Sequence, residues 1–353
     1  MKRIIILLSI LTLLISCSTE KNGKQELKTV KLTKLHTIEG YPEGADSTRT
    51  FSLWWKGVKV DDEGNVFIRD KKSGSIRVFD NKGRFKNNIT AEGMGPEEVE
   101  IMSGYYLDKD TVCIIDNRIK LKKFLKNGQY LSYKVIEYDE ISSPIDIQEL
   151  NDSTLVVRVI FGKTIDDVRM VGQSLDIYNK SFVKINRIYE SFIDYLNESD
   201  KLFFTEPIFA FNDSSIFLTT RNKSEYKVGI YSHQGKLVGN IRKNYFKKRF
   251  TEDELDKIFG KDNRPENYKN IYEYKIAIYE MMCDKYGYLW TLTDGYAYGD
   301  MVYDIFDNDR LIAKFILERS DEKKVTRSIV LKDKFFLIDY DNGLIEVYDY
   351  EFE

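Results

Sequence analysis

A four-strand pattern that returns six times constrains this chain more than any other feature. Residues 60–68 and 75–85 are two successive copies of alternating apolar and polar residues around an Asp- and Gly-containing turn, which is typical of β-hairpins. The first turn of each four-strand copy falls near residues 61, 108, 151, 212, 284 and 332. Spacings of about 40 to 50 residues, with two longer ones, are typical of a β-propeller with four strands in each blade.

The two ends of this pattern complement each other. The sixth copy ends after its third strand, and a strand-like segment at residues 27–38 precedes the first copy. We expect this segment to pair as the outer strand of the last blade, because ring closure removes an open sheet edge. The predicted fold is all-β: a six-bladed β-propeller of four-stranded antiparallel blades over residues 28–353, closed by an N-terminal strand, with short helical insertions.

Two segments interrupt the repeat and predict the helical insertions. Residues 189–199 place apolar side chains on one side of a short helix. The longer segment, 244–274, contains Thr251 and Glu254 in a capping-box spacing, followed by apolar residues and Gly260, which predicts a capped helix of two turns. An insertion of this length is either functional or a cover over apolar surface at a blade rim.

The N-terminus has the three parts of a signal peptide, predicted for residues 1–16. A basic pair, Lys2 and Arg3, precedes an apolar stretch that is shorter than the ~20 residues needed to span a bilayer. The stretch ends in Leu-Ile-Ser-Cys, which resembles a lipobox with Cys17 as the lipid-attachment (palmitate) site, followed by a polar lipidated tether over residues 17–27. Diacylation would anchor the chain to a membrane; the alternative is an ordinary secretory signal with a chance cysteine.

Charge and cysteine usage narrow the classes of partner. The formal net charge is −3, and losing Lys2 and Arg3 with the signal peptide makes the mature chain more acidic. No basic stripe suitable for nucleic acid appears, so we expect no nucleic-acid partner. Cys113 and Cys283 lie in apolar strand-like runs, and we expect two separate buried thiols rather than a disulfide, although an oxidising compartment would permit one.

One connector carries a family resemblance. Residues 92–98 read Glu-Gly-Met-Gly-Pro-Glu-Glu. With the two hairpins at 60–85 they resemble the six-bladed β-propeller lipoproteins of Gram-negative bacteria, relatives of NHL-repeat propellers, which commonly have G-x-G-P-G-E here; Glu97 replaces the third glycine. The resemblance implies the fold, a cell-envelope location and a binding role. Ser18 follows Cys17, and this position would carry Asp in a lipoprotein retained in the inner membrane, so we expect the outer membrane. Both the periplasmic and the surface face of that membrane are possible locations.

Propeller topology predicts where a ligand would bind. The connectors between blades and the middle loop of each blade gather on one face around the central channel, where ligand sites in propellers usually lie. Arginine offers a planar set of donors to an anionic or hydroxyl-rich ligand, and tyrosine could stack on a sugar or peptide. The alternative is that these loop residues are solvated or make strand-end hydrogen bonds. The predicted binding residues are Arg69, Asp70, Arg118, Arg221, Tyr296, Tyr298, Asp300 and Tyr340.

The residue types favour a binding or scaffold module for a glycan, a peptide or an envelope protein. The alternative is a propeller enzyme of the lactonase, lyase or hydrolase type, possibly calcium-dependent. A transition-metal enzyme would need several histidines around the channel, whereas the chain has only His36 and His233. No common catalytic motif appears, so we assign no catalytic residue, metal or cofactor. A third possibility is a structural partner in an envelope complex.

Overall fold

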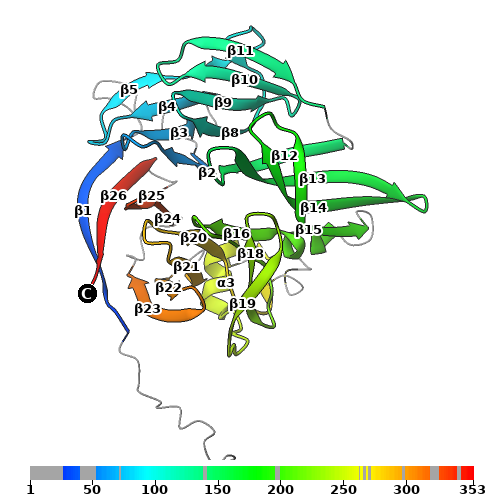
Figure 1. Ribbon diagram of the computed structural model, residues 1–353. Helices are drawn as coiled ribbons and strands as arrows, with labels where there is room; N and C mark the ends of the chain where they lie inside the picture. Colours follow the sequence, from blue (N-terminus) through cyan, green and yellow to red (C-terminus); the bar gives the residue numbers. More distant parts are fainter. Residues whose placement is uncertain are drawn as a thin grey trace, which may run out of the picture.

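The structure is a computed structural model of the 353-residue chain. It describes residues 27–39, 53–70, 73–137, 141–194, 199–261, 263–264, 268, 272–295, 299–318, 326–339 and 343–353. Across these ranges, six four-stranded antiparallel sheets are arranged as blades around a centre (Figure 1). Within the described part of the chain, no helix is both long and apolar enough to cross a bilayer.

Each blade consists of four strands that are consecutive in the chain, except the last. Blade 1 has β2 (Leu53–Val60), β3 (Val66–Asp70), β4 (Ser75–Phe79) and β5 (Phe85–Asn88); blade 2 has β8 (Met102–Asp108), β9 (Thr111–Asp116), β10 (Lys120–Leu125) and β11 (Tyr130–Val135). Blade 3 has β12 (Ile141–Glu149), β13 (Thr154–Ile165), β14 (Val168–Asn179) and β15 (Lys184–Asp194); blade 4 has β16 (Pro207–Phe211), β17 (Ser215–Thr220), β18 (Tyr226–Ser232) and β19 (Leu237–Lys243). Blade 5 has β20 (Glu280–Cys283), β21 (Leu289–Asp294), β22 (Met301–Asp307) and β23 (Arg310–Leu317); blade 6 has β24 (Thr326–Leu331), β25 (Lys334–Asp339), β26 (Leu344–Phe352) and β1 (Val30–Glu39).

The hydrophobic core lies between the blades. The second strand of a blade is covered on both faces by its neighbours, so it is a continuous apolar run rather than an alternating one, as in β9 and β25. One buried cluster, for example, joins Phe67 of blade 1 to Ile114 and Phe124 of blade 2. Outer strands such as β11 are mostly exposed, which explains why their sequences are less apolar.

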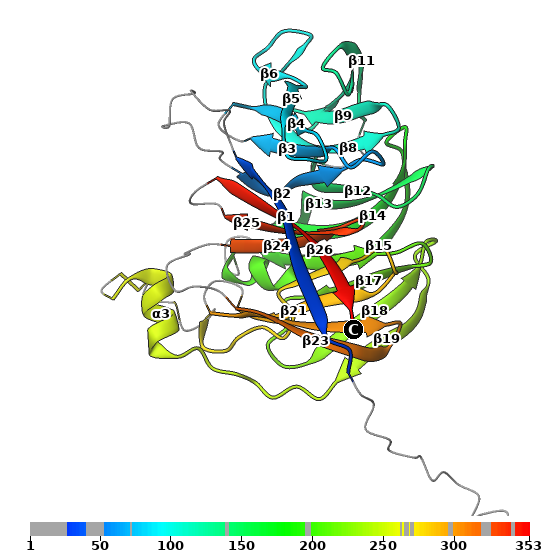
Figure 2. The same cartoon turned by 90° about the vertical axis from the view of Figure 1, so that its left-hand side faces the viewer.

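The N-terminal strand closes the ring, as the sequence predicts. β1 pairs antiparallel with β26, from Val30 opposite Phe352 to Glu39 opposite Leu344, and the two strands lie side by side in Figures 1 and 2. Just before β1, Thr29 exchanges two backbone hydrogen bonds of 2.9 Å with Glu353. Blade 6 is therefore built from both ends of the described chain.

The turns separate the two faces of the ring. The turns that join first to second and third to fourth strands lie on what we call the hairpin face; the blade connectors and the middle loops lie on the connector face. On the hairpin face, Asp61 Oδ1 accepts the backbone amides of Glu63 and Asn65, an Asx turn. Lys126 of blade 2 forms a 2.9 Å ion pair with Asp61, so the turns also link neighbouring blades.

One helix is confirmed and the other prediction is wrong. α3 (Glu252–Phe259) has Thr251 as its N-cap in a capping box with Glu254 and ends at Gly260, which has a φ of 80°. In the segment 189–199, where the sequence predicts a helix, residues 189–194 are instead the second half of β15, and Ser199 begins a 3-10 helix, η1 (Ser199–Thr205). Residues 195–198 lie outside the described residues. Pairing with the 12-residue strand β14 extends residues 189–194, because a sheet ladder outweighs weak local helix propensity.

The Gly-rich connector, residues 92–98, lies between blades 1 and 2 and contacts blade 2. Its ends lie in β6 (Ala91–Glu92) and β7 (Glu98–Val99), a short parallel pair. The Glu98 side chain accepts the Gly95 amide at 2.8 Å, and a Cβ at Gly93 would collide with that side chain. Lys122 of blade 2 donates to the carbonyl groups of Gly95 and Glu98. The connector is thus held by contacts within the protein.

Candidate functional site

A cavity of about 330 Å³ occupies the channel between the six innermost strands, β2, β8, β12, β16, β20 and β24. That volume falls at the lower end of the range for small-molecule sites, ~300–1,000 Å³. Its wall mixes apolar side chains, such as Phe209 and Met281, with charged ones. Because all six blades contribute, a ligand there would contact residues that are far apart in the sequence.

A repeated aspartate closes the connector-face end of most blades. Asp70, Asp116, Asp294 and Asp339 are each the last residue of the second strand of their blade. Asp70 pairs with a basic residue of the same blade, Arg77, at 3.0 Å. Asp116 likewise pairs with Lys122 at 3.0 Å. These buried pairs explain several charges at blade ends without a ligand.

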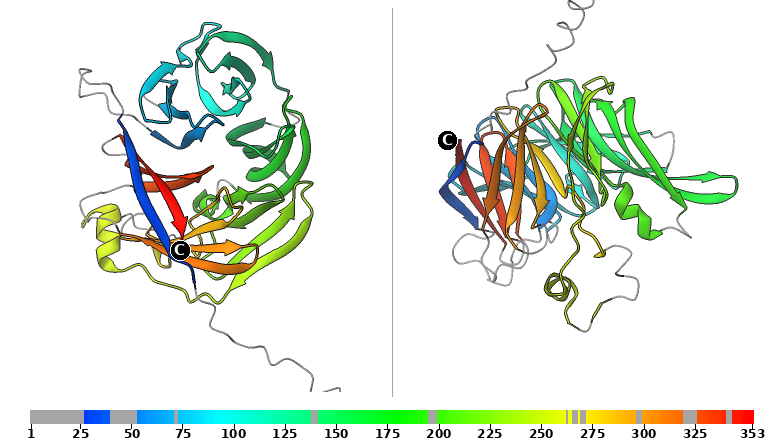
Figure 3. Two further views of the ribbon diagram at one scale, coloured as in Figure 1. Left: turned by 60° about the vertical axis from the view of Figure 1, so that its left-hand side comes forward. Right: turned by 90° about the horizontal axis from the view of Figure 1, so that it is seen from below.

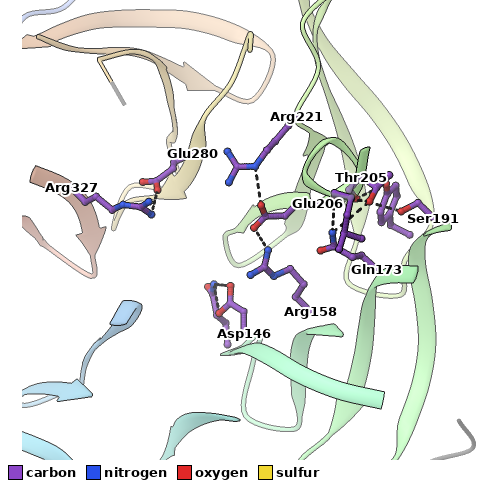
Figure 4. A network of polar contacts seen from close by, with 12 residues as sticks. Asp146, Arg158, Gln173, Ser191, Thr205, Glu206, Arg221, Glu280 and Arg327 are labelled. Atoms are coloured by element: carbon purple, nitrogen blue, oxygen red, sulfur yellow. Dashed lines mark hydrogen bonds and ion pairs between the residues drawn. The ribbon is translucent and has the colours of Figure 1, made fainter. Parts of the chain in front are cut away.

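Blades 3 and 4 depart from this arrangement and direct charge towards the channel. Glu206 precedes β16, and its two carboxylate oxygens bind Arg158 of β13 and, at 2.8 Å, Arg221 just after β17 (Figure 4). The three side chains are only 7%, 13% and 3% exposed for Arg158, Glu206 and Arg221. Burial, reinforced by the charge of Arg221 and opposed by Asp146, lowers the pKa of Arg158 from its ordinary value. One carboxylate thus holds two guanidinium groups, of which that of Arg221 lines the cavity.

A second ion pair lies across the cavity from this triad. Glu280 begins β20 of blade 5 and accepts a 2.9 Å hydrogen bond from Arg327 of β24 in blade 6. Figure 4 shows this pair on the other side of the open space from Glu206 and Arg221. Asp146, which is buried and lies opposite Arg158 in the β12–β13 ladder, adds a further carboxylate. Charges of both signs therefore surround the connector-face end of the channel.

An aromatic side chain borders the charged cluster. η1 carries Phe203, which is 39% exposed, and the Arg221 guanidinium lies over its ring at 4.3 Å, a cation–π contact. Hydrogen bonds from Gln173 Nε2 to the Leu202 carbonyl oxygen and from Tyr189 OH to the Thr205 carbonyl oxygen, both 2.9 Å, hold η1 against blade 3. This ring is therefore positioned by the fold.

The α3 insertion is fastened to blade 5 by a cluster of charges, which we call the α3 clasp: Lys248, Glu254, Lys275 and Asp294. Lys275 Nζ lies 2.6 Å from Glu254 Oε1 and 2.9 Å from Asp294 Oδ1, and Lys248 pairs with Asp294 at 3.1 Å. Burial disfavours the charged forms, but hydrogen bonds and opposite charges prevail, raising the pKa of Lys275 and lowering the pKa of Asp294. Figures 2 and 3 show α3 standing out from the ring.

The structure brings one of the predicted binding residues, Arg221, to the cavity wall. Arg69 donates to the Met102 carbonyl oxygen between blades 1 and 2, and burial lowers the pKa of Arg69 to about 10. Asp70 is buried in the ion pair with Arg77. Arg118 occupies the β9–β10 turn with a φ of 69°, and its side chain is exposed.

The remaining predicted residues do not add to this cluster. Asp300 is exposed just before β22 and is not part of the cavity wall. Tyr296, Tyr298, Tyr340 and the lipid-attachment residue Cys17 lie outside the described residues.

Sequence reasoning missed most of the channel cluster. It did not single out Arg158, Glu206, Glu280, Arg327 or Phe203. Arg158 had a usable signal, because it interrupts the apolar run Leu-Val-Val-Arg-Val-Ile-Phe of a strand that is otherwise buried. Charged residues are rarely buried unless they are paired, so such an interruption predicts a buried ion pair.

The cysteine thiols and His233 have structural surroundings. Cys113 and Cys283 are both free, as predicted, and burial raises the pKa of each thiol. Among the described residues, no group of three or more His, Cys, Asp or Glu side chains is placed to hold a metal ion. His233 makes a 2.9 Å hydrogen bond to the Asn212 carbonyl oxygen in a hairpin-face turn.

Comparisons with known proteins agree on the fold. A family model, DUF5128, described as a 6-bladed beta-propeller, matches residues 55–308. A candidate exported protein of Bacteroides fragilis NCTC 9343 aligns with a TM-score of 0.52 at 12% identity, covering 92% of this chain and 95% of the other. A DUF4221-family protein of Bacteroides vulgatus aligns with a TM-score of 0.55 at 10% identity, covering 93% and 99%. A search of curated proteins finds no match. At these identities the solved structures inform on fold alone.

Proposed function

This chain belongs to the DUF5128 family of six-bladed β-propellers, and we propose that it is a lipid-anchored cell-envelope protein that binds a ligand at the connector-face end of its channel. The observation that carries the binding role is the cavity, where the Arg158–Glu206–Arg221 triad and the Glu280–Arg327 pair face each other. Buried charges are costly, and at the connector-face ends of blades 1 and 2 the buried aspartates Asp70 and Asp116 each pair with a basic residue of the same blade. Charges directed instead into a cavity are typical of a recognition site.

The same residues favour a binding role. Glu206 and Glu280 are each held by arginine, so their carboxylate oxygens are hydrogen-bond acceptors of fixed position. The geometry therefore supports recognition of a ligand by fixed hydrogen-bonding groups.

The N-terminal motif supports the anchored, exported part of the proposal. Leu-Ile-Ser-Cys ends a short apolar stretch, and a lipidated cysteine with two or more acyl chains gives stable membrane attachment. Ser18 supports the outer membrane as the destination. The Gly-rich connector and the hairpin motifs support a lipoprotein branch related to NHL-repeat propellers.

Radiolabelled palmitate tests the anchor. We expect the wild-type chain to incorporate label and to sediment with membranes, and Cys17→Ala to do neither, because the acylated thiol is gone. Cys113→Ala is the matched control, since that thiol is buried between blades, and should leave labelling unchanged. Label retained by Cys17→Ala would contradict the lipid-anchor proposal.

Thermal shift tests the binding site. Full-length protein in detergent is screened against oligosaccharides, peptides and envelope extract, because a ligand that binds only the folded state raises the melting temperature. The double variant Glu280→Gln/Arg327→Met removes both charges of one pair together. We expect the shift to vanish in this variant. A ligand that shifts both proteins equally would place the site elsewhere.

A further inference from the structure

We infer that the ligand bound at the channel is a charge-neutral, hydroxyl-rich chain, that is, the end of an oligosaccharide. The inference rests on the proposed function, which it deepens by naming the ligand class. Three observations carry it: the charges at the cavity are balanced, their ion pairs suit groups that both donate and accept, and an aromatic ring borders them.

The charge balance argues against an ionic ligand. At the connector-face end, the cationic side chains Arg158, Arg221 and Arg327 are matched by the anionic side chains Asp146, Glu206 and Glu280. The arginines already bind carboxylates of the protein. An ionic ligand placed beside such a pair would meet a charge of its own sign as well as one of the opposite sign, so its attraction to the pair offsets little of the cost of leaving water.

Hydroxyl groups match the ion pairs that are present. A carboxylate only accepts hydrogen bonds and a guanidinium only donates them, whereas a hydroxyl group does both through a single oxygen. One sugar hydroxyl can therefore accept from Arg327 while it donates to Glu280, which lie 2.9 Å apart. A peptide needs two separate groups for the same task, since its N–H only donates and its C=O only accepts.

Phe203 supplies the apolar surface that such a ligand needs. A pyranose ring presents C–H groups on its faces, and these pack against aromatic rings. Phe203 is 39% exposed and lies just outside the cavity wall, where the guanidinium of the wall residue Arg221 lies over its ring. The ring and the charged groups are thus adjacent, so one sugar unit could contact both.

Calorimetric titration of the full-length protein, in a detergent without a sugar headgroup, tests the inference. The probes are neutral trisaccharides (malto-, cello-, xylo- and chitotriose), the acidic trigalacturonate, and tri-alanine blocked at both ends. We expect at least one neutral trisaccharide to bind, and to bind equally well at low and high salt, because no net charge is neutralised. Trigalacturonate and the peptide should bind at least tenfold more weakly.

Variants locate the contact. Phe203→Ala should weaken binding about five- to tenfold, the scale of one aromatic contact, while Phe203→Tyr should retain it. Phe246→Ala is the matched control, since Phe246 is an aromatic side chain that is 86% exposed elsewhere, and should bind as the wild type does. Glu280→Gln/Arg327→Met should also weaken binding of the neutral trisaccharide.

The outcomes separate the inference from the proposed function. Preferential binding of trigalacturonate or peptide that Glu280→Gln/Arg327→Met abolishes would overturn the sugar inference and leave the binding site in place. Neutral-sugar binding that none of the variants alters would overturn the inference as well, because the contact would lie elsewhere. If no neutral trisaccharide binds, the sugar inference is overturned. If none of the probes binds and the envelope extract causes no thermal shift, the proposed function is overturned too.

Discussion

Glu206 has a double role at the channel, because its one carboxylate pairs with two buried guanidinium groups. Without that negative charge, Arg158 and Arg221 would face each other as like charges in a poorly solvated place. Removing one partner from a buried ion network costs more than the network contributes when intact. At Glu206, therefore, stability and the proposed ligand recognition depend on the same atoms.

We expect Glu206→Gln to lower the free energy of unfolding by about 3–5 kcal/mol, the scale for breaking a buried ion pair. Glu353→Gln is the matched control: its ion pair with Lys31 joins side chains that are 57% and 62% exposed, and its loss should cost less than about 1 kcal/mol. Urea unfolding followed by circular dichroism measures both. Equal, small changes would show that the triad is solvated in solution.

At the scale of single residues, the sequence predicts less than the structure contains. The repeat predicts Arg221 as a binding residue because it follows the second strand of a blade, and Arg221 does line the cavity. The same rule selected Arg69 and Arg118, which face a blade interface and solvent. The repeat predicts where a strand ends, but the side of the blade that a charged side chain faces depends on its ion-pair partner. That partner can be distant in the sequence, since Glu206 is 48 residues from Arg158.

At the scale of elements, α3 is attached by the charges of the α3 clasp, so its attachment must depend on pH. The pKa values of Glu254 and Asp294 are lowered in the folded protein. Their contribution is present above the unfolded carboxyl values, about 4, and is lost as pH falls through the folded values. The pKa of Lys275 is raised, so its contribution is present below about 10.5 and is lost as pH rises through its folded value.

Hydrogen exchange of residues 252–259 should detect this release. We expect protection factors, corrected for the intrinsic pH dependence of exchange, to fall for α3 below about pH 4 while those of β9 and β25 stay high. Lys275→Met should lower α3 protection already at neutral pH, because Glu254 and Asp294 lose their shared partner. Protection of α3 that is unchanged by acid would mean that aromatic packing alone, such as Phe259 against Tyr272, holds the insertion.

The two insertions show what local sequence can and cannot decide. Thr251 and Glu254 form a capping box from residues three apart, so a local pattern was enough to predict α3. Residues 189–199 have helical spacing as well, yet residues 189–194 pair with β14. Their conformation is set by a neighbouring strand, and no pattern within the segment itself contains that information.

At the scale of the whole molecule, the ring depends on β1. Ile38 is fully buried in a cluster that combines β1 with strands of blades 1 and 6. We expect Ile38→Ala to cost about 2–5 kcal/mol and Leu35→Ala, at a position that is 45% exposed, to stay within about 0.5 kcal/mol. Denaturant unfolding should remain one transition with an unchanged m value. A separate transition at low denaturant would show that β1 detaches before the ring opens.

The fold could be predicted because the sequence pattern that specifies a blade is repeated. Each hairpin turn and each apolar second strand gives the same signal six times, and the shortage of one strand at the end matches the surplus strand at the beginning. Sites do not repeat in this way. The triad in blades 3 and 4 is a departure from the pattern, and a departure can be recognised only once the regular partners, such as Asp70 with Arg77, are seen in space.

Closure by β1 also imposes an order in time. Lys31 and Glu353 contact each other across 322 residues of chain, so blade 6 cannot be completed until the final strand has been synthesised. Until then the first strand has no partner, and contacts between distant residues form slowly. The ring of a nascent chain with this topology therefore stays open until β26 has been made and can pair with β1.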